Sequence, residues 1–137
     1  MTPDRLHFFW DYFDVPNAGI ADFRGRPHVF HRQFDDDADE WTDRYILRQV
    51  DDELFTLARA RHDLFRKWLV QFHRGAVLAD GQTVLAQDRP RYLELERQIG
   101  RRLDAASDRS FIMRADFWRP DLATGDGEVR WSKVTES

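Results

Sequence analysis

Two long stretches with helical periodicity, set between short aromatic-rich segments, constrain the fold more than any other feature. Apolar residues recur at helical spacing from residue 51 to 75 and again from 88 to 103. The flanking apolar segments are shorter, are bounded by Gly, Pro, Asn or Asp, and have the character of strands. The predicted strands are 6–13, 20–24, 28–34, 45–50, 111–118 and 128–134.

This order of elements predicts an α+β fold of the type ββββααββ. Strands followed by helices and then by strands favour an antiparallel sheet of about five to six strands, with two helices packed on one face. The other face would then stay partly open. No internal repeat or low-complexity linker interrupts the chain, so residues 1–137 are expected to form a single α+β domain.

Local signals fix the expected ends of the elements. Asp51 is a suitable N-cap for the first helix, and Gly75 a suitable C-terminal stop. Asp88 and Pro90 favour the start of the second helix. The segment 14–19 carries Pro, Asn and Gly and is predicted to be a turn, while Gly25 is predicted to lie in a hairpin between two short strands.

Composition excludes several classes of protein. Hydrophobic residues make up 42% and aromatic residues 14%, too much for a disordered chain, and the absence of Cys excludes disulfides, thiolate zinc sites and cysteine nucleophiles. The charged N-terminus does not fit a signal peptide, and no apolar run is long enough to span a membrane. We therefore expect a cytoplasmic protein. Its net charge of −4 makes nucleic acid an unlikely partner.

A run of carboxylates between the third and fourth predicted strands is the first candidate site. Its spacing does not fit an EF-hand, because Glu40 and Ile46 stand where that loop needs Gly and Glu. Three interpretations stay open: a solvated loop that discourages aggregation, a surface for a protein partner, and a metal site. The candidate partner surface consists of Asp35, Asp36, Asp37, Asp39 and Glu40.

Arg61 is the second candidate, because it falls near the middle of the apolar stripe of the first helix. A buried guanidinium needs a carboxylate or an opening to solvent, and Asp11, Asp14 and Asp22 are the expected partners. The structural alternative is an ion pair, or a side chain whose stem is buried while its head reaches water. The functional alternative is an anion or carboxylate pocket formed by Arg61, Asp11, Asp14, Tyr12 and Trp68.

The opening strands carry more aromatic side chains than one side of a short sheet can hold. Some are expected on the uncovered face, where they would favour a protein partner or a homodimer, unless loops and chain ends cover them. The aromatic residues concerned are Trp10, Tyr12, Phe13, Phe23, Phe30 and Phe34.

No motif indicates catalysis or a cofactor. The chain lacks G-x-S-x-G, the P-loop, G-x-G-x-x-G and H-E-x-x-H. His28 and His31 are expected on opposite faces of a strand, and His62 and His73 are about 16 Å apart along a helix, so neither pair is spaced to share a metal. No catalytic residue, metal or cofactor is predicted.

Two segments resemble a group of small bacterial proteins that have no assigned activity. The first is Trp10–Pro16 followed by Gly19–Gly25, and the second is Trp68 with Phe72–Gly75. The resemblance covers about the first half of the chain. It implies a bacterial stand-alone domain and carries no functional residue over.

These observations favour a non-catalytic interaction or ligand-binding protein. A small acidic inhibitor or immunity-type protein, using the carboxylate run and exposed aromatic rings, is one concrete version. The alternative is a small enzyme or anion-binding domain with its pocket around Arg61, Asp11 and Asp14.

Overall fold

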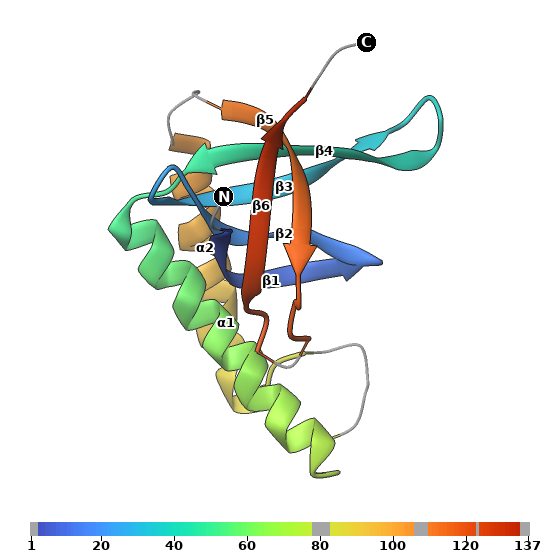
Figure 1. The fold of residues 1–137 in the computed structure, drawn as a ribbon. Coiled ribbons are helices and arrows are strands. Elements are labelled where there is room, and N and C mark those ends of the chain that lie inside the picture. The colour runs from blue at the N-terminus through green and yellow to red at the C-terminus, as the bar shows by residue number, and fades with distance from the viewer. Residues whose placement is uncertain (1–2, 78–82, 106–109, 123, 135–137) are drawn as a thin grey trace. The chain divides into compact units, whose positions relative to one another are not determined.

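The computed structural model describes residues 3–77, 83–105, 110–122 and 124–134, which fall into two compact units (Figure 1). One unit combines Met1–Asp51 with Ser107–Ser137 and contains the strands. The other unit, Asp52–Ala106, contains the helices. The helical unit is therefore an insertion in the chain between the fourth and fifth strands.

The strand unit is an antiparallel sheet closed into a six-stranded barrel in sequence order. The sheet closes where Asp4, Arg5 and Leu6 of the first strand pair with Val129, Glu128 and Gly127 of the last. The predicted α+β class, antiparallel pairing and ββββααββ order are confirmed. The strands are β1 (Asp4–Phe13), β2 (Val15–Phe23), β3 (Arg26–Asp35), β4 (Glu40–Gln49), β5 (Ser110–Trp118) and β6 (Gly127–Lys133).

Aromatic side chains from the strands fill the interior of the barrel. The Phe30 ring is fully buried, and its centroid lies 5.9 Å from that of Tyr45, 5.7 Å from that of Phe117 and 5.9 Å from that of Trp131. Both polar groups of this cluster are satisfied, because Tyr45 Oη donates to Pro16 O at 2.8 Å and Trp131 Nε1 donates to Asp22 O at 2.9 Å. Because the sheet closes into a barrel, the side chains on its inner face pack against one another as a hydrophobic core.

The start of the barrel has an irregular strand pairing and a shorter connection than the sequence predicted. Register shifts along β1 break the simple alternation of side chains, so Leu6 and Phe9 both contribute to the aromatic core. The predicted turn at 14–19 is wrong, because only Asp14 separates β1 from β2. Gly19 lies inside β2, where an added Cβ would come within 2.7 Å of Phe9 Cα and 2.9 Å of Phe30 Cζ. It is required for this close approach and not for a turn.

The helical unit is a pair of helices linked by ion pairs. It comprises α1 (Asp52–His73), the short 3₁₀ helix η1 (Ala86–Asp88) and α2 (Arg89–Ala105). Arg102 pairs with Glu53 near one end of the helix pair, and Lys67 Nζ lies 3.1 Å from Asp88 Oδ2 near the other. The predicted helices at 51–75 and from 88 are therefore present with ends shifted by one or two residues. No helix among the described residues is long and apolar enough to cross a membrane.

Candidate functional site

The acidic run forms the tip of the β3–β4 hairpin. β3 continues to Asp35 and β4 begins at Glu40, so the connecting turn is shorter than the loop expected from the sequence. Asp35 Oδ1 accepts the backbone N–H groups of Asp37 at 3.0 Å and Ala38 at 3.1 Å, which is a local Asx-type turn. Asp39 adopts a positive φ of 53°, a conformation that Asp tolerates better than most residues. The carboxylates are therefore held on an ordered turn.

Two aromatic rings flank this turn. Phe34 and Trp41 are cross-strand partners, their ring centroids are 5.1 Å apart, and the rings meet edge to face at 80°. Phe34 is 42% exposed. Cross-strand aromatic pairs stabilise a hairpin, but this pair does so while leaving apolar surface in contact with water.

Arg32 anchors the hairpin below the aromatic pair. Its Nε donates to Thr42 O at 2.6 Å, and its Nη1 donates to Asn17 Oδ1 on β2 at 3.4 Å. Its guanidinium carbon also lies 5.7 Å from the Trp41 ring centroid, within the range of a cation–π contact. Arg32 therefore ties β2, β3 and β4 together beneath the tip.

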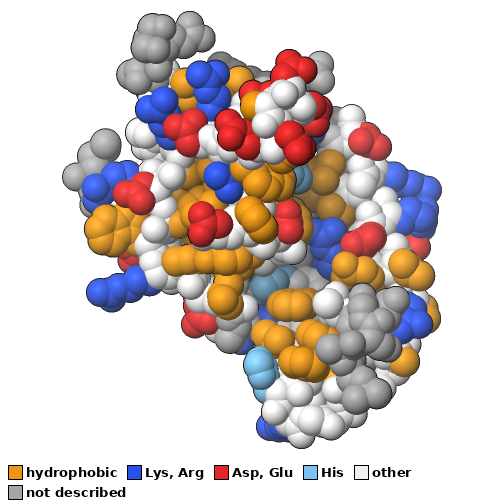
Figure 2. Space-filling model, turned by 90° about the vertical axis from the view of Figure 1, so that its right-hand side faces the viewer, with side chains coloured by type: hydrophobic (Ala, Val, Ile, Leu, Met, Phe, Trp, Pro, Cys, Tyr) orange, Lys and Arg blue, Asp and Glu red, His pale blue; other side chains and the backbone are white. Residues whose placement is uncertain are grey.

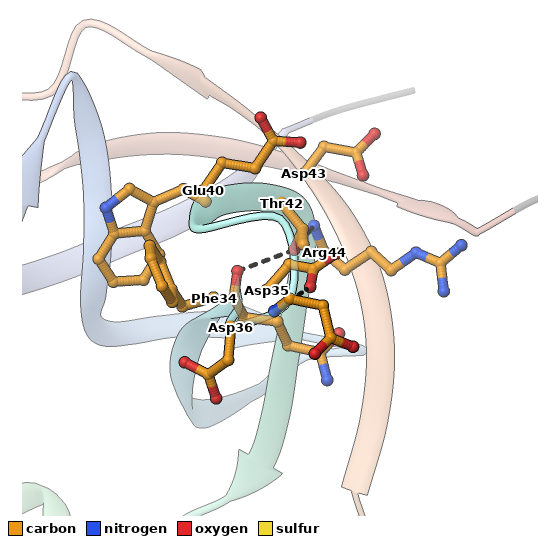
Figure 3. Close-up of a pocket in the computed structure, with 10 residues that line it drawn as sticks. Phe34, Asp35, Asp36, Glu40, Thr42, Asp43 and Arg44 are labelled. Carbon is orange, nitrogen blue, oxygen red and sulfur yellow. Dashed lines mark hydrogen bonds between the residues drawn. The ribbon is translucent and has the colours of Figure 1, made fainter.

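An open groove of about 910 Å³ runs along the hairpin. In the close-up of Figure 3, Glu40 lies on one side of the strand pair and Asp36 on the other, and the Arg44 side chain extends away from Phe34. Both strands supply the lining, so carboxylates and aromatic rings both border the groove. Its lining residues are Gln33, Phe34, Asp35, Asp36, Asp37, Glu40, Trp41, Thr42, Asp43 and Arg44.

Negative charge at this tip is only partly neutralised. Asp43 Oδ2 lies 3.0 Å from Arg114 Nε on β5 and forms an ion pair. In the described part of the chain, Asp36, Asp37 and Glu40 form no ion pair. Carboxylates crowded on one turn repel each other, and an incoming cation would relieve that repulsion.

A second exposed tip lies between β1 and β2. Phe13 is 64% exposed and Tyr12 is 41% exposed, although the Tyr12 ring still contacts Phe9, with centroids 5.7 Å apart. Asp11 is exposed, and Asp14 forms the turn with a φ of 68°. This tip therefore combines aromatic and acidic side chains, as the β3–β4 tip does.

The predicted pocket around Arg61 draws on both units. Asp11, Asp14 and Tyr12 belong to the barrel, whereas Arg61 belongs to α1 in the helical unit. Within its own unit, Arg61 Nη1 lies 3.7 Å from Glu96 Oε1 on α2, a partner that sequence reasoning missed. Burial lowers the pKa of Arg61, and the nearby Tyr92 and Glu96 oppose this effect.

Trp68, the aromatic wall predicted for that pocket, is buried on α1. Its ring stacks on Phe72, with centroids 5.1 Å apart and planes at 15°. Phe65 stacks on its other side along the helix, with centroids 6.2 Å apart. Within the helical unit, the Trp68 side chain is thus engaged in an aromatic ladder, and its part in a pocket stays a prediction.

His7 and His28 each have a hydrogen-bond partner. His7 Nε2 lies 2.7 Å from Asp22 Oδ1, while the His28 Nδ1–H donates to Arg26 O at 2.8 Å inside the barrel. His31 is exposed. No group of three or more His, Cys, Asp or Glu side chains suited to hold a metal ion occurs among the described residues, and this includes the acidic tip.

Sequence reasoning found the carboxylates of the β3–β4 tip and Phe34, but it missed Arg32 and Trp41. Arg32 and Phe34 are two apart on a predicted strand, which is the spacing that places side chains on the same face. That signal was present in the sequence. The contact with Trp41 depends on a register shift between Arg32 and Phe34 in the β3–β4 pairing, which no sequence pattern marks. Comparisons with protein-family models, with curated proteins and with solved structures found no match to this chain.

Proposed function

We propose that the protein is a non-catalytic binding module that captures a basic, Lys- or Arg-bearing segment of a protein partner at the tip of the β3–β4 hairpin. The observation that carries this proposal is the Phe34–Trp41 pair, in which the Phe34 ring is 42% exposed, bordering a groove that Asp36, Asp37 and Glu40 line. Carboxylates attract the charged head of a basic side chain, and aromatic faces accommodate both its cationic head and its apolar stem.

The geometry of the tip supports binding by a preformed surface. The Asx-type turn at Asp35 and the contacts of Arg32 hold the hairpin in place before a partner arrives. A site that is ordered in advance loses less conformational entropy when it binds. An inhibitor or immunity-type role, in which the tip covers a basic surface of an enzyme or toxin, is one form that this binding would take.

The direct test uses a fluorescein-labelled deca-lysine peptide and fluorescence anisotropy at low salt. The tip variant is Asp36→Asn, Asp37→Asn and Glu40→Gln. We expect it to weaken binding at least about ten-fold, which corresponds to about 1.4 kcal/mol. We also expect binding of the unaltered protein to weaken as salt increases, because exposed charges are screened.

A matched control distinguishes an effect of this site from an effect of the net charge. The control variant is Asp63→Asn, Asp116→Asn and Glu128→Gln, three exposed carboxylates that do not belong to the hairpin, and it changes the net charge by the same amount. It should bind within about two-fold of the unaltered protein. Equal losses in the two variants, or no saturable binding of deca-lysine, would overturn the proposal and leave the tip as a solvated turn.

A further inference from the structure

The tips of the β1–β2 and β3–β4 hairpins emerge from the same end of the barrel. Strands alternate in direction around an antiparallel barrel whose order follows the sequence, so the first and third connections share an end and the second lies opposite. Figure 1 shows the blue β1–β2 tip and the cyan β3–β4 tip projecting to the same side. Segments about twenty residues apart in the sequence therefore present their turns in one direction.

Contacts below the tips link the two hairpins. Arg32 on β3 donates to Asn17 on β2, and Tyr45 on β4 donates to Pro16 O on β2. Asn17 is 3% exposed, so the link lies in the folded body of the barrel and not on its surface. The two tips thus stand on one rigid base.

Both tips carry exposed aromatic rings next to carboxylates. Phe13 is the more exposed ring on the first tip, and Phe34 is the exposed ring on the second. In the upper part of Figure 2, hydrophobic and acidic side chains lie next to one another, with some Lys or Arg side chains among them. An exposed surface of mixed aromatic and like-charged residues is typical of a site for an oppositely charged partner. The carboxylates of the two tips are Asp11, Asp14, Asp35, Asp36, Asp37, Asp39 and Glu40.

We infer that the two tips form one continuous binding surface, and that its occupant is an extended polycationic segment of a protein that reaches both. This deepens the function proposed for the β3–β4 tip and rests on it. Asp11 and Asp14, together with Phe13 and Tyr12, supply the second half of the surface. Charge complementarity selects the occupant, because the carboxylates of both tips point to a chain with several basic side chains. A single lysine side chain would engage one tip only.

The test uses peptide length to distinguish one tip from two. An extended chain covers at most about 3.5 Å per residue, so tri-lysine spans roughly 10 Å and deca-lysine more than three times that length. The first-tip variant is Asp11→Asn with Asp14→Asn; Asn tolerates the positive φ at position 14, so the turn is kept. The matched control is Asp63→Asn with Asp116→Asn.

We expect the first-tip variant to weaken deca-lysine binding at least five-fold and the control less than two-fold. Tri-lysine binding should weaken in the β3–β4 tip variant. In the first-tip variant it should weaken no more than in the control. Phe13→Ser, which removes the most exposed ring of the first tip, should weaken deca-lysine binding about three-fold without lowering the melting temperature.

Three other outcomes would each contradict the inference, and the experiment distinguishes between them. If the first-tip variant binds deca-lysine like its control while the β3–β4 variant does not, the inference fails and the proposed function stands. If neither variant loses affinity, both fail. If sedimentation velocity shows a concentration-dependent dimer that the tip variants dissociate, the surface belongs to a second copy of the chain and the inferred occupant is wrong.

Discussion

The barrel interior and the β3–β4 tip are built from the same kinds of residue but put them to different uses. Inside, Phe30 and Tyr45 contact Trp131 edge to face, and the polar atoms of Tyr45 and Trp131 have partners within the fold. At the tip, Phe34 and Trp41 make the same edge-to-face contact, but Phe34 remains 42% exposed and the pair borders a groove that carboxylates also line. Aromatic content alone therefore does not distinguish core from binding surface. The neighbouring residues do.

From this difference we predict that mutations in the core and mutations at the tip affect different properties of the protein. Core changes should lower the free energy of unfolding, because buried apolar area and packing are lost. Tip changes should leave it nearly unchanged and affect only binding.

Phe30→Ala should have the largest effect, a loss of about 3–5 kcal/mol in the free energy of unfolding, because it empties the centre of the aromatic cluster. Urea denaturation followed by tryptophan fluorescence measures it. A loss below about 1 kcal/mol would mean that Phe30 contributes no more to stability than the tip aromatics do. The proposed distinction between core and tip would then be wrong.

Gly19→Ala should cost about 1–3 kcal/mol, because the new methyl group would meet the Phe8 carbonyl oxygen, Phe9 Cα and Phe30 Cζ. Gly100→Ala on α2 is the matched control. An added Cβ there meets nothing within 4 Å, and alanine favours a helix by up to about 1 kcal/mol, so this variant should be slightly stabilised. Similar melting temperatures for the two variants would contradict the close approach of β1 and β3 to Gly19.

Tyr45→Phe should cost about 1 kcal/mol at neutral pH, because Pro16 O loses its donor. Burial also raises the pKa of Tyr45 to about 12, whereas an unfolded tyrosine titrates near 10. The stabilisation of the neutral, buried phenol is therefore complete below pH 10 and is lost as the pH rises from 10 to 12, a change of roughly 3 kcal/mol.

The Tyr45→Phe variant has no such titrating group, so the difference in stability between it and the unaltered protein should shrink and then reverse over that pH range. Denaturation curves at pH 7, 10 and 11.5 on both proteins measure the difference. A difference that is constant with pH would show that Tyr45 is not held neutral in the core.

Phe34→Ser should have the smallest effect on stability, about 0.5 kcal/mol or less, because the ring is substantially exposed. It should nevertheless weaken binding of deca-lysine about three-fold or more. A loss of stability comparable with that of Tyr45→Phe, together with unchanged binding, would place Phe34 with the core and remove the aromatic half of the proposed site.

Most of the element order was readable from the sequence because it depends on local periodicity. The two amphipathic helices and the final strands lie within one or two residues of their predicted bounds. The segment 14–19 was misjudged, because Pro16, Asn17 and Gly19 are typical turn residues in isolation. In the barrel they lie within β2, where Asn17 contacts Arg32 and Gly19 makes room for Phe30.

The acidic residues of the candidate site could also be identified from the sequence, because they are neighbours along the chain. The contact between Phe34 and Trp41 could not be predicted from the sequence. It depends on how β3 pairs with β4, including the register shift in that pairing. The ion pair of Arg61 with Glu96 was missed for the same reason: the two residues are far apart in the chain and meet only when α1 and α2 pack.

The type and order of the elements, the absence of cysteine chemistry and the position of the negative charge can be read from the amino-acid sequence without a structure. These properties follow from composition and from repeats of two or 3.6 residues along one chain segment. Tertiary structure alone decided that the sheet closes, that Asp14 and Asp36 project from the same end of the barrel, and which aromatic rings are exposed. The physical reason is that closure and shared direction depend on pairing between distant strands, and pairing is a property of two segments and not of one.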